Sequence, residues 1–428
     1  MLKLSLAAIC VVFASGHLTG STLPGPGVSL KAGIGYEFFS QEFFLDSLDQ
    51  AGADSLDITT ALKTTYLDDL KAQIRLGYVP FEDYRLELDG YYEQTKDSYR
   101  IRGYWNYRPN LGPFRLDWNS ELDWRDGTPE AGESDPGYLT GSGRAKLALP
   151  LSRSTSLWGR GRAEFVRFDS AGAGAFDYRR ITGELGTSHT FSSYSMLSGS
   201  GFVARRIVPD SPAQEYRSIG LDGSFLGFYP DGEIDVLSRY ESRDYNRPGA
   251  IEDYFRWELD IRNRHNLSER FFAREEVELE IIHFDTTSYL TSDYRRIETS
   301  IMAGITGPAS SVAAGPRLEI LDETQTDPYV IGEDYVEYGM KAQLDLIQPG
   351  QLFASLETVT GVRNLRDEGN TDAPQSDFIF ERLNFLGDWS PAGRLSLNLL
   401  LSVDWEWHDN SDENSRMVLL TTGLSYAL

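Results

Sequence analysis

The sequence of 428 residues contains a single cysteine, Cys10. A lone cysteine cannot form an intramolecular disulfide, so crosslinks cannot stabilise this fold. Thiolate metal sites need several cysteines and are excluded too. Because Cys10 falls in a segment that we expect to be removed, thiol catalysis is excluded as well.

Long hydrophobic runs are also scarce. After Gly16, no apolar stretch approaches the roughly 20 residues that a transmembrane helix needs. The one apolar run is short, follows Lys3 and ends in small residues. This order is typical of a secretory signal peptide, and we expect residues 1–16 to be removed by cleavage near Gly16 to Gly20.

Positive charge is in short supply. The chain has 65 acidic and 40 basic residues, which gives a formal net charge of −25. Nucleic acids are bound by clusters of Lys and Arg, so we expect no nucleic-acid partner.

What the sequence has in abundance is alternation with a period of two. The clearest segment, 394–407, alternates leucine, valine and tryptophan with serine, asparagine, aspartate and glutamate, and only Leu400 breaks the polar face. A strand has this two-residue repeat and a helix does not. Since charges recur at every second position, these strands are not buried on both faces. The same pattern occurs in 70–78, 114–124, 255–262 and 336–346.

The connections alternate between short turns and longer polar loops. The turns carry proline, glycine and aspartate, as in 230–232 and 348–350. Turns at one end and long loops at the other are the layout of a transmembrane β-barrel, with the turns on the periplasmic side. We therefore predict an all-β fold, one transmembrane antiparallel β-barrel over residues 28–428. The long loops are 125–137, 169–177, 208–215, 242–253, 285–292, 322–334, 364–377 and 408–415.

The strand number follows from the rule that such barrels have an even number of strands. The alternating segments number about 21, but bacterial single-chain barrels have an even number. Either 56–66 and 70–78 form one long strand, or 28–38 lies outside the barrel. Both alternatives give about 20 strands, within a range of about 18 to 22.

A secreted β-sandwich or β-propeller would alternate as well. It would show a repeated blade motif or strands buried between two sheets, and the sequence has no such repeat. Tryptophans instead fall on apolar faces near strand ends, as the aromatic belt of a membrane interface requires. They are Trp105, Trp118, Trp124, Trp257, Trp389, Trp405 and Trp407.

The last residues alternate up to the terminus, with Tyr426 two places before Leu428. An aromatic residue two places before a final apolar one resembles the assembly signal of Gram-negative outer-membrane β-barrel proteins, which usually ends in Phe. The whole chain resembles porin-like barrels in architecture, although no motif selects one family. The resemblance implies an outer-membrane location, contact with outer-membrane lipid, and contact with barrel-assembly machinery through the C-terminal strand.

If the apolar faces meet lipid, the polar faces line a lumen of mixed charge. Basic residues concentrate on two neighbouring strands. They predict either an anion-selective constriction or a salt-bridge ladder with nearby glutamates that stiffens the wall. The candidate lumen-lining residues are Arg144, Lys146, Arg160, Arg162, Arg180, Glu164, Glu184, Arg256, Glu258 and Arg262.

The long loops are acidic, most clearly 126–135, 322–333 and 367–377. Carboxylate oxygens of this kind suit calcium or magnesium, although no loop follows the twelve-residue calcium pattern. The two alternatives are divalent cations bound at these loops and a solvated anionic rim.

Histidine is too rare to suggest an enzyme, with five residues in the chain. His189, His265 and His283 fall on apolar strand faces, and only His408 shares a polar face. A hydrolase needs a histidine beside a nucleophile or carboxylate, and a lone His408 does not supply that set. The sequence has no Gly-rich phosphate loop either, so it predicts neither catalysis nor a cofactor.

These features together predict an outer-membrane pore for polar or charged small solutes. Two alternatives stay open. One is an export conduit for a polymer such as exopolysaccharide, working with periplasmic partners. The other is a barrel with a structural or assembly role that does not conduct. A plugged receptor is disfavoured, because strands that begin by Val28 leave no room for a globular N-terminal plug.

Overall fold

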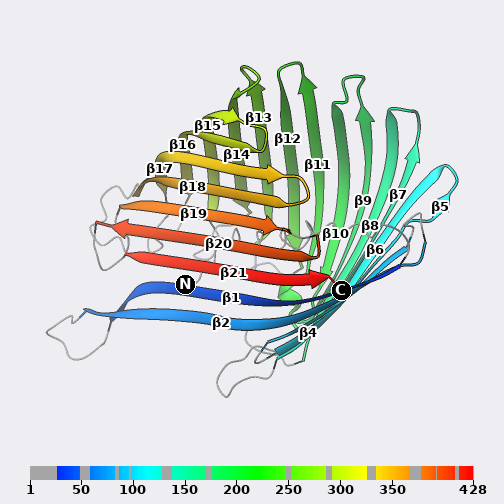
Figure 1. Ribbon diagram of the computed structural model, residues 1–428, viewed down its shortest axis with the longest axis horizontal. Coiled ribbons are helices and arrows are strands. Elements are labelled where there is room, and N and C mark those ends of the chain that lie inside the picture. The colour runs from blue at the N-terminus through cyan, green and yellow to red at the C-terminus, as the bar shows by residue number, and fades with distance from the viewer. Residues whose placement is uncertain are drawn as a thin grey trace.

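The alternating segments form antiparallel strands, and each strand pairs with its neighbour along the chain (Figure 1). The structure is a computed structural model. It describes residues 27–48, 58–81, 86–95, 98–127, 137–169, 176–246, 252–285, 292–324, 334–365, 377–391, 393–409 and 414–427. The expected signal peptide, 1–16, lies outside these residues, and so does most of each acidic loop.

The strands have these bounds. The first half of the chain forms β1 (Gly27–Leu48), β2 (Ile58–Val79), β3 (Leu86–Gln94), β4 (Ser98–Tyr107), β5 (Asn110–Leu111), β6 (Phe114–Gly127), β7 (Tyr138–Pro150), β8 (Thr155–Phe168), β9 (Tyr178–Thr190), β10 (Met196–Ile207) and β11 (Tyr216–Tyr229). The second half forms β12 (Gly232–Tyr245), β13 (Tyr254–Asn266), β14 (Phe271–Phe284), β15 (Asp293–Thr306), β16 (Ser310–Thr324), β17 (Tyr335–Gln348), β18 (Leu352–Leu365), β19 (Phe378–Trp389), β20 (Leu395–His408) and β21 (Ser415–Ala427).

The sheet closes on itself. β21 pairs with β1, from Ala427 opposite Lys31 to Arg416 opposite Glu42. The two-residue segment β5 pairs only with the start of β6, while β4 pairs with β6 directly. The ring therefore has 20 strands, and the predicted all-β transmembrane type of barrel is confirmed. A closed ring leaves no strand edge unpaired.

The structure also decides between the two parity alternatives. β2 runs without interruption from Ile58 to Val79, so 56–66 and 70–78 belong to one long strand. The other alternative is wrong, because Val28 to Phe38 lies in β1 and pairs with β2. The physical reason lies in the alternation, because the apolar positions are even-numbered both before and after Asp68 and Asp69. A tight two-residue turn there would have moved them to odd-numbered positions.

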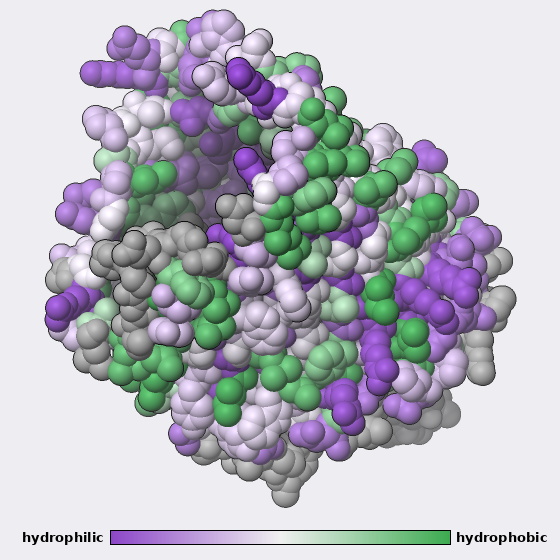
Figure 2. All heavy atoms as spheres, turned by 90° about the vertical axis from the view of Figure 1, so that its right-hand side faces the viewer, coloured by the Kyte–Doolittle hydropathy of each residue, from purple (hydrophilic) through white to green (hydrophobic). Residues whose placement is uncertain are grey.

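The two faces of the wall differ as the alternation predicts. Leu221, Ile181 and Val203 lie on the outer wall and are each at least 60% exposed. Side chains of opposite parity on the same strands point into the lumen. Figure 2 shows hydrophilic side chains inside a hollow and hydrophobic side chains over parts of the outer wall.

No single apolar core fills the barrel, as expected for a ring wider than about 8 strands. Buried apolar side chains instead form two small clusters on the inner face of the described strands. One cluster contains Phe272, Met302 and Ala313, and the other contains Val359, Phe378 and Phe380.

The connections confirm the expected asymmetry. Tight turns such as 151–154, 230–231 and 349–351 join the strands at one end, and the longer loops join them at the other. Gly350 and Gly393 have φ of +71° and +58° in these turns, a backbone conformation that favours glycine. The described residues include one 3-10 helix, η1 (Pro212–Gln214), and among them no helix is long and apolar enough to cross a membrane.

Candidate functional site

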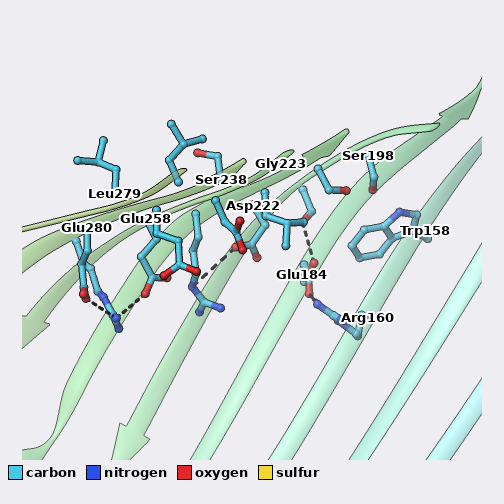
Figure 3. A pocket seen from close by; sticks show the side chains of 18 of the residues that line it. Trp158, Arg160, Glu184, Ser198, Asp222, Gly223, Ser238, Glu258, Leu279 and Glu280 are labelled. Atoms are coloured by element: carbon cyan, nitrogen blue, oxygen red, sulfur yellow. Dashed lines mark hydrogen bonds and ion pairs between the residues drawn. The ribbon is translucent and has the colours of Figure 1, made fainter. Parts of the chain in front are cut away.

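A cavity of about 700 Å³ lies against the inner wall of β7 to β15 (Figure 3). Its lining mixes polar and apolar side chains and carries both charges. Four serines, Ser198, Ser200, Ser224 and Ser238, and the side chain of Trp158 also contribute. Such a surface offers hydrogen-bond donors, acceptors and one aromatic face to a solute.

A second cavity of about 150 Å³ adjoins the first and shares Arg160, Glu184, Asp222 and Arg239 with it. Its lining is predominantly basic. Five arginines and two carboxylates contribute: Arg144, Arg160, Arg162, Arg180 and Arg239, with Glu184 and Asp222.

The ten candidate residues lie on the lumen face of β7, β8, β9 and β13. Five of them line the larger cavity: Lys146, Arg160, Glu184, Arg256 and Glu258. The smaller cavity adds Arg144, Arg162 and Arg180. Glu164 pairs with Arg162 at 2.8 Å and with Arg180 at 3.8 Å, and Arg262 pairs with Asp260 at 2.8 Å.

Some of the basic residues are neutralised by neighbours. Arg160 donates from Nε to Oε2 of Glu184 at 2.6 Å, and Ser200 donates to the other oxygen of Glu184 at 2.8 Å. Arg256 lies between two carboxylates, Glu258 and Glu280, at 2.5 Å from each. Figure 3 shows both arrangements, so part of the predicted salt-bridge ladder is present.

Arg144 and Lys146 are not neutralised in this way. Neither forms an ion pair with any residue that the structure describes. The strand register places Arg144 opposite Arg162, and Lys146 opposite Arg160. Lys146 Nζ lies 4.7 Å from the centre of the Trp158 ring, a cation–π contact, and Asp117 of β6 lies opposite Lys146 in the register without forming an ion pair with it. Arg160 and Arg162 are paired with Glu184 and Glu164, so the net positive charge of this four-residue patch comes from Arg144 and Lys146.

Trp158 was not among the candidate residues. It is buried in the lumen wall because Gly186 on β9 has no side chain, and a Cβ at Gly186 would lie 2.4 Å from Trp158 Cζ2. The sequence does contain a sign that Trp158 faces the lumen. Trp158 shares its parity with Arg160 and Arg162, whereas the other tryptophans occupy the apolar face.

Asp222 and Arg239 were also missed, although they line both cavities. They face each other across β11 and β12 and lie 3.8 Å apart. The alternation of Asp235, Arg239 and Glu241 along β12 could have identified this face as polar.

A second charged cluster lies across β15 to β20 and is electrically balanced. Glu337 is completely buried and contacts Arg317, Arg363 and Arg382. The cluster contains four arginines and four carboxylates, namely Arg296, Arg317, Arg363, Arg382, Glu298, Glu319, Glu337 and Asp404. Because its charges cancel, this cluster stabilises the wall and leaves the net positive potential to the patch on β7 and β8.

Residues suited to catalysis or metal binding do not gather in the described part of the chain. No group of three histidine, cysteine or acidic side chains there could hold a metal ion. His408 faces the lumen as its register predicts, with Nε2 3.7 Å from Glu406. The predicted cation sites in the acidic loops fall largely on residues outside the described part.

Comparison with known proteins identifies the fold only. No family model and no curated protein matches the sequence. Among solved structures, the FrpB iron transporter from Neisseria meningitidis (F5-1 variant) superposes with a TM-score of 0.55 at 12% identity, over 94% of this chain and 82% of that chain. The siderophore receptor PirA from Pseudomonas aeruginosa gives a TM-score of 0.53 at 10% identity, over 94% and 81%. The outer membrane protein opdK from Pseudomonas aeruginosa gives 0.46 at 9% identity, over 94% and 98%. The chain thus has the fold of the outer-membrane β-barrels.

Proposed function

We propose that this protein is an outer-membrane pore for small polar or charged solutes and that its middle section favours anions. The observation that supports the proposal is the cluster of five arginines and two carboxylates around the smaller cavity. It includes Arg144 and adjoins Lys146, and neither of these two forms an ion pair with a described residue. A positive, confined surface raises the local concentration of anions. The iron transporter and siderophore receptor barrels with similar folds make transport the natural role for a barrel of this size.

The proposed pore also accounts for the pairing of the other charges. Carboxylates next to Arg160, Arg162 and Arg256 keep most of the wall near neutrality. A solute therefore meets net positive charge over a short distance instead of along the whole path. A solute that meets charge over only a short distance is attracted into the pore but not held tightly, as conduction requires.

We place the long loops outside the cell and the tight turns in the periplasm, following the general layout of such barrels. In this orientation β21, which closes the ring against β1, is the proposed contact with the barrel-assembly machinery. The outer wall meets lipid.

Electrical recording tests the proposal. Purified protein, inserted in a planar bilayer of neutral synthetic lipid, should conduct in open steps. Under a salt gradient the reversal potential should have the sign expected for anions. A folded barrel that never conducts would contradict the pore and favour a structural or assembly role, whereas a cation preference would contradict the role of the basic patch.

A further inference from the structure

Four exposed arginines stand side by side on the outer wall, where a barrel normally presents apolar residues. Arg167, Arg179, Arg205 and Arg217 belong to the consecutive strands β8, β9, β10 and β11 (Figure 1). Each has the parity opposite to the lumen-lining residues of its own strand, such as Arg160, Glu184, Ser200 and Asp222. They therefore point away from the lumen, and we call them the outer arginine row.

The row is continuous. Arg205 lies directly opposite Arg217 in the β10–β11 register. Arg179 is two residues from Ile181, the partner of Arg205, and is thus its diagonal neighbour. Arg167 is in turn two residues from Phe165, the partner of Arg179. Direct and diagonal neighbours lie about 5 to 8 Å apart, so one multivalent anion can contact several of these side chains.

No carboxylate among the described residues forms an ion pair with the row. The four arginines make no ion pair or hydrogen bond through their side chains with any described residue, and they are the only charged residues at the outward positions of β8 to β11. Asp244 faces Arg217 across β11 and β12 and bounds the row on that side, without forming an ion pair. Like charges that face each other destabilise a sheet. A bound anion would therefore reduce the electrostatic repulsion among these arginines.

The position of the row along the strands indicates the kind of anion. Each arginine lies within two residues of the end of its strand, at the end of the barrel that carries the long loops. Below the row, five aliphatic side chains on the same face are about 60% exposed: Ile181, Leu185, Val203, Ile219 and Leu221. Cationic groups above an apolar surface match a ligand with phosphates at one end and acyl chains at the other.

We propose that the outer arginine row binds a phosphorylated glycolipid of the lipid A type in the outer leaflet. Guanidinium groups hold phosphate through paired, charge-assisted hydrogen bonds. The acyl chains lie along the aliphatic side chains of β9 to β11. This inference uses the proposed orientation, with the long loops outside the cell, but it does not depend on conduction.

Two matched double variants test the inference. The first, Arg205→Gln with Arg217→Gln, removes the directly opposed pair of the row. The second, Arg295→Gln with Arg416→Gln, removes two exposed outward arginines that lie near strand ends on β15 and β21, away from the row. The probe is lipid A with two phosphates, titrated into purified barrel in neutral detergent and followed by native mass spectrometry. Circular dichroism and heat-modifiable gel migration verify that each variant is folded.

We expect wild type and the second variant to bind lipid A alike, and the first variant to bind about ten-fold more weakly or worse. Enzymatically dephosphorylated lipid A should bind all three proteins equally weakly. Equal affinity of both variants, or equal binding of both lipids by wild type, would overturn the inference. Because the proposed pore is recorded in bilayers free of this glycolipid, failure of one proposal does not entail failure of the other.

Discussion

Arg317 of β16 and Glu337 of β17 form an ion pair in which the side chains are 5% and 0% exposed. Arg363 and Arg382 approach the same carboxylate at 2.7 Å and 3.1 Å. A carboxylate with three cationic partners is the centre of this network. Without its charge, Arg363 has no described carboxylate partner, and the balanced cluster gains a net positive charge.

We therefore expect Glu337→Gln to destabilise the barrel by about 3–5 kcal/mol, the usual cost of removing one partner from a buried ion pair. Urea unfolding in lipid vesicles, followed by tryptophan fluorescence, measures the change. The matched control is Glu121→Gln, because Glu121 pairs with Arg102 at 3.1 Å while both side chains stay partly exposed. The control should cost less than about 1 kcal/mol. Similar losses in both variants would show that the buried network has no special role.

Gly186 gives a second prediction about the wall. Gly186→Ala places a methyl group 2.4 Å from Trp158 Cζ2 and 2.7 Å from Ser200 Cβ, so the indole must shift. We expect a loss of about 1–3 kcal/mol from overpacking, with a shift in tryptophan emission. Gly161→Ala on β8 is the control, because a Cβ there meets no atom within 4 Å. If Gly186→Ala unfolds at the same urea concentration as the control, the glycine does not make room for the indole.

The period of two explains how much of this fold the sequence predicts. It predicts the lumen faces of β8 and β13, because a one-residue error would turn every charge toward lipid. The total of about 20 strands also needed the rule that bacterial barrels have an even strand number. The alternation could not tell which arginine is neutralised, since Arg160 finds Glu184 only through the β8–β9 register. The partners of Glu337 come from three other strands, and Arg382 reaches it from β19 across β18, which depends on two strand registers together. The sequence misses Trp158 for another reason, because its lumen parity alone does not indicate that an indole lines a cavity.

The assignment of the lipid-facing side can be tested on a single strand. Leu221 is 63% exposed near the middle of β11, while Ser224 of the same strand lines the lumen cavity. Leu221→Arg should cost about 2–4 kcal/mol, the penalty for a lipid-facing arginine near the midplane. Ser224→Arg should assemble normally, since its side chain meets a wet lumen. Folding yield into vesicles, read from heat-modifiable gel migration, compares the two. A reversed order would mean that the faces are exchanged.

The basic patch on β7 and β8 provides the most direct test of selectivity. Arg144→Glu together with Lys146→Glu reverses the two charges that have no carboxylate partner. The reversal potential should shift strongly toward cations under a salt gradient, because the net positive zone becomes negative. The control, Arg153→Glu with Arg270→Glu, makes the same change in net charge within the exposed turns that follow β7 and β13. At physiological salt, charges are screened over about 8 Å, so the control should leave selectivity nearly unchanged. Equal shifts in both double variants would attribute selectivity to overall charge. A conducting pore in which neither variant shifts would show that Arg144 and Lys146 do not act as a filter.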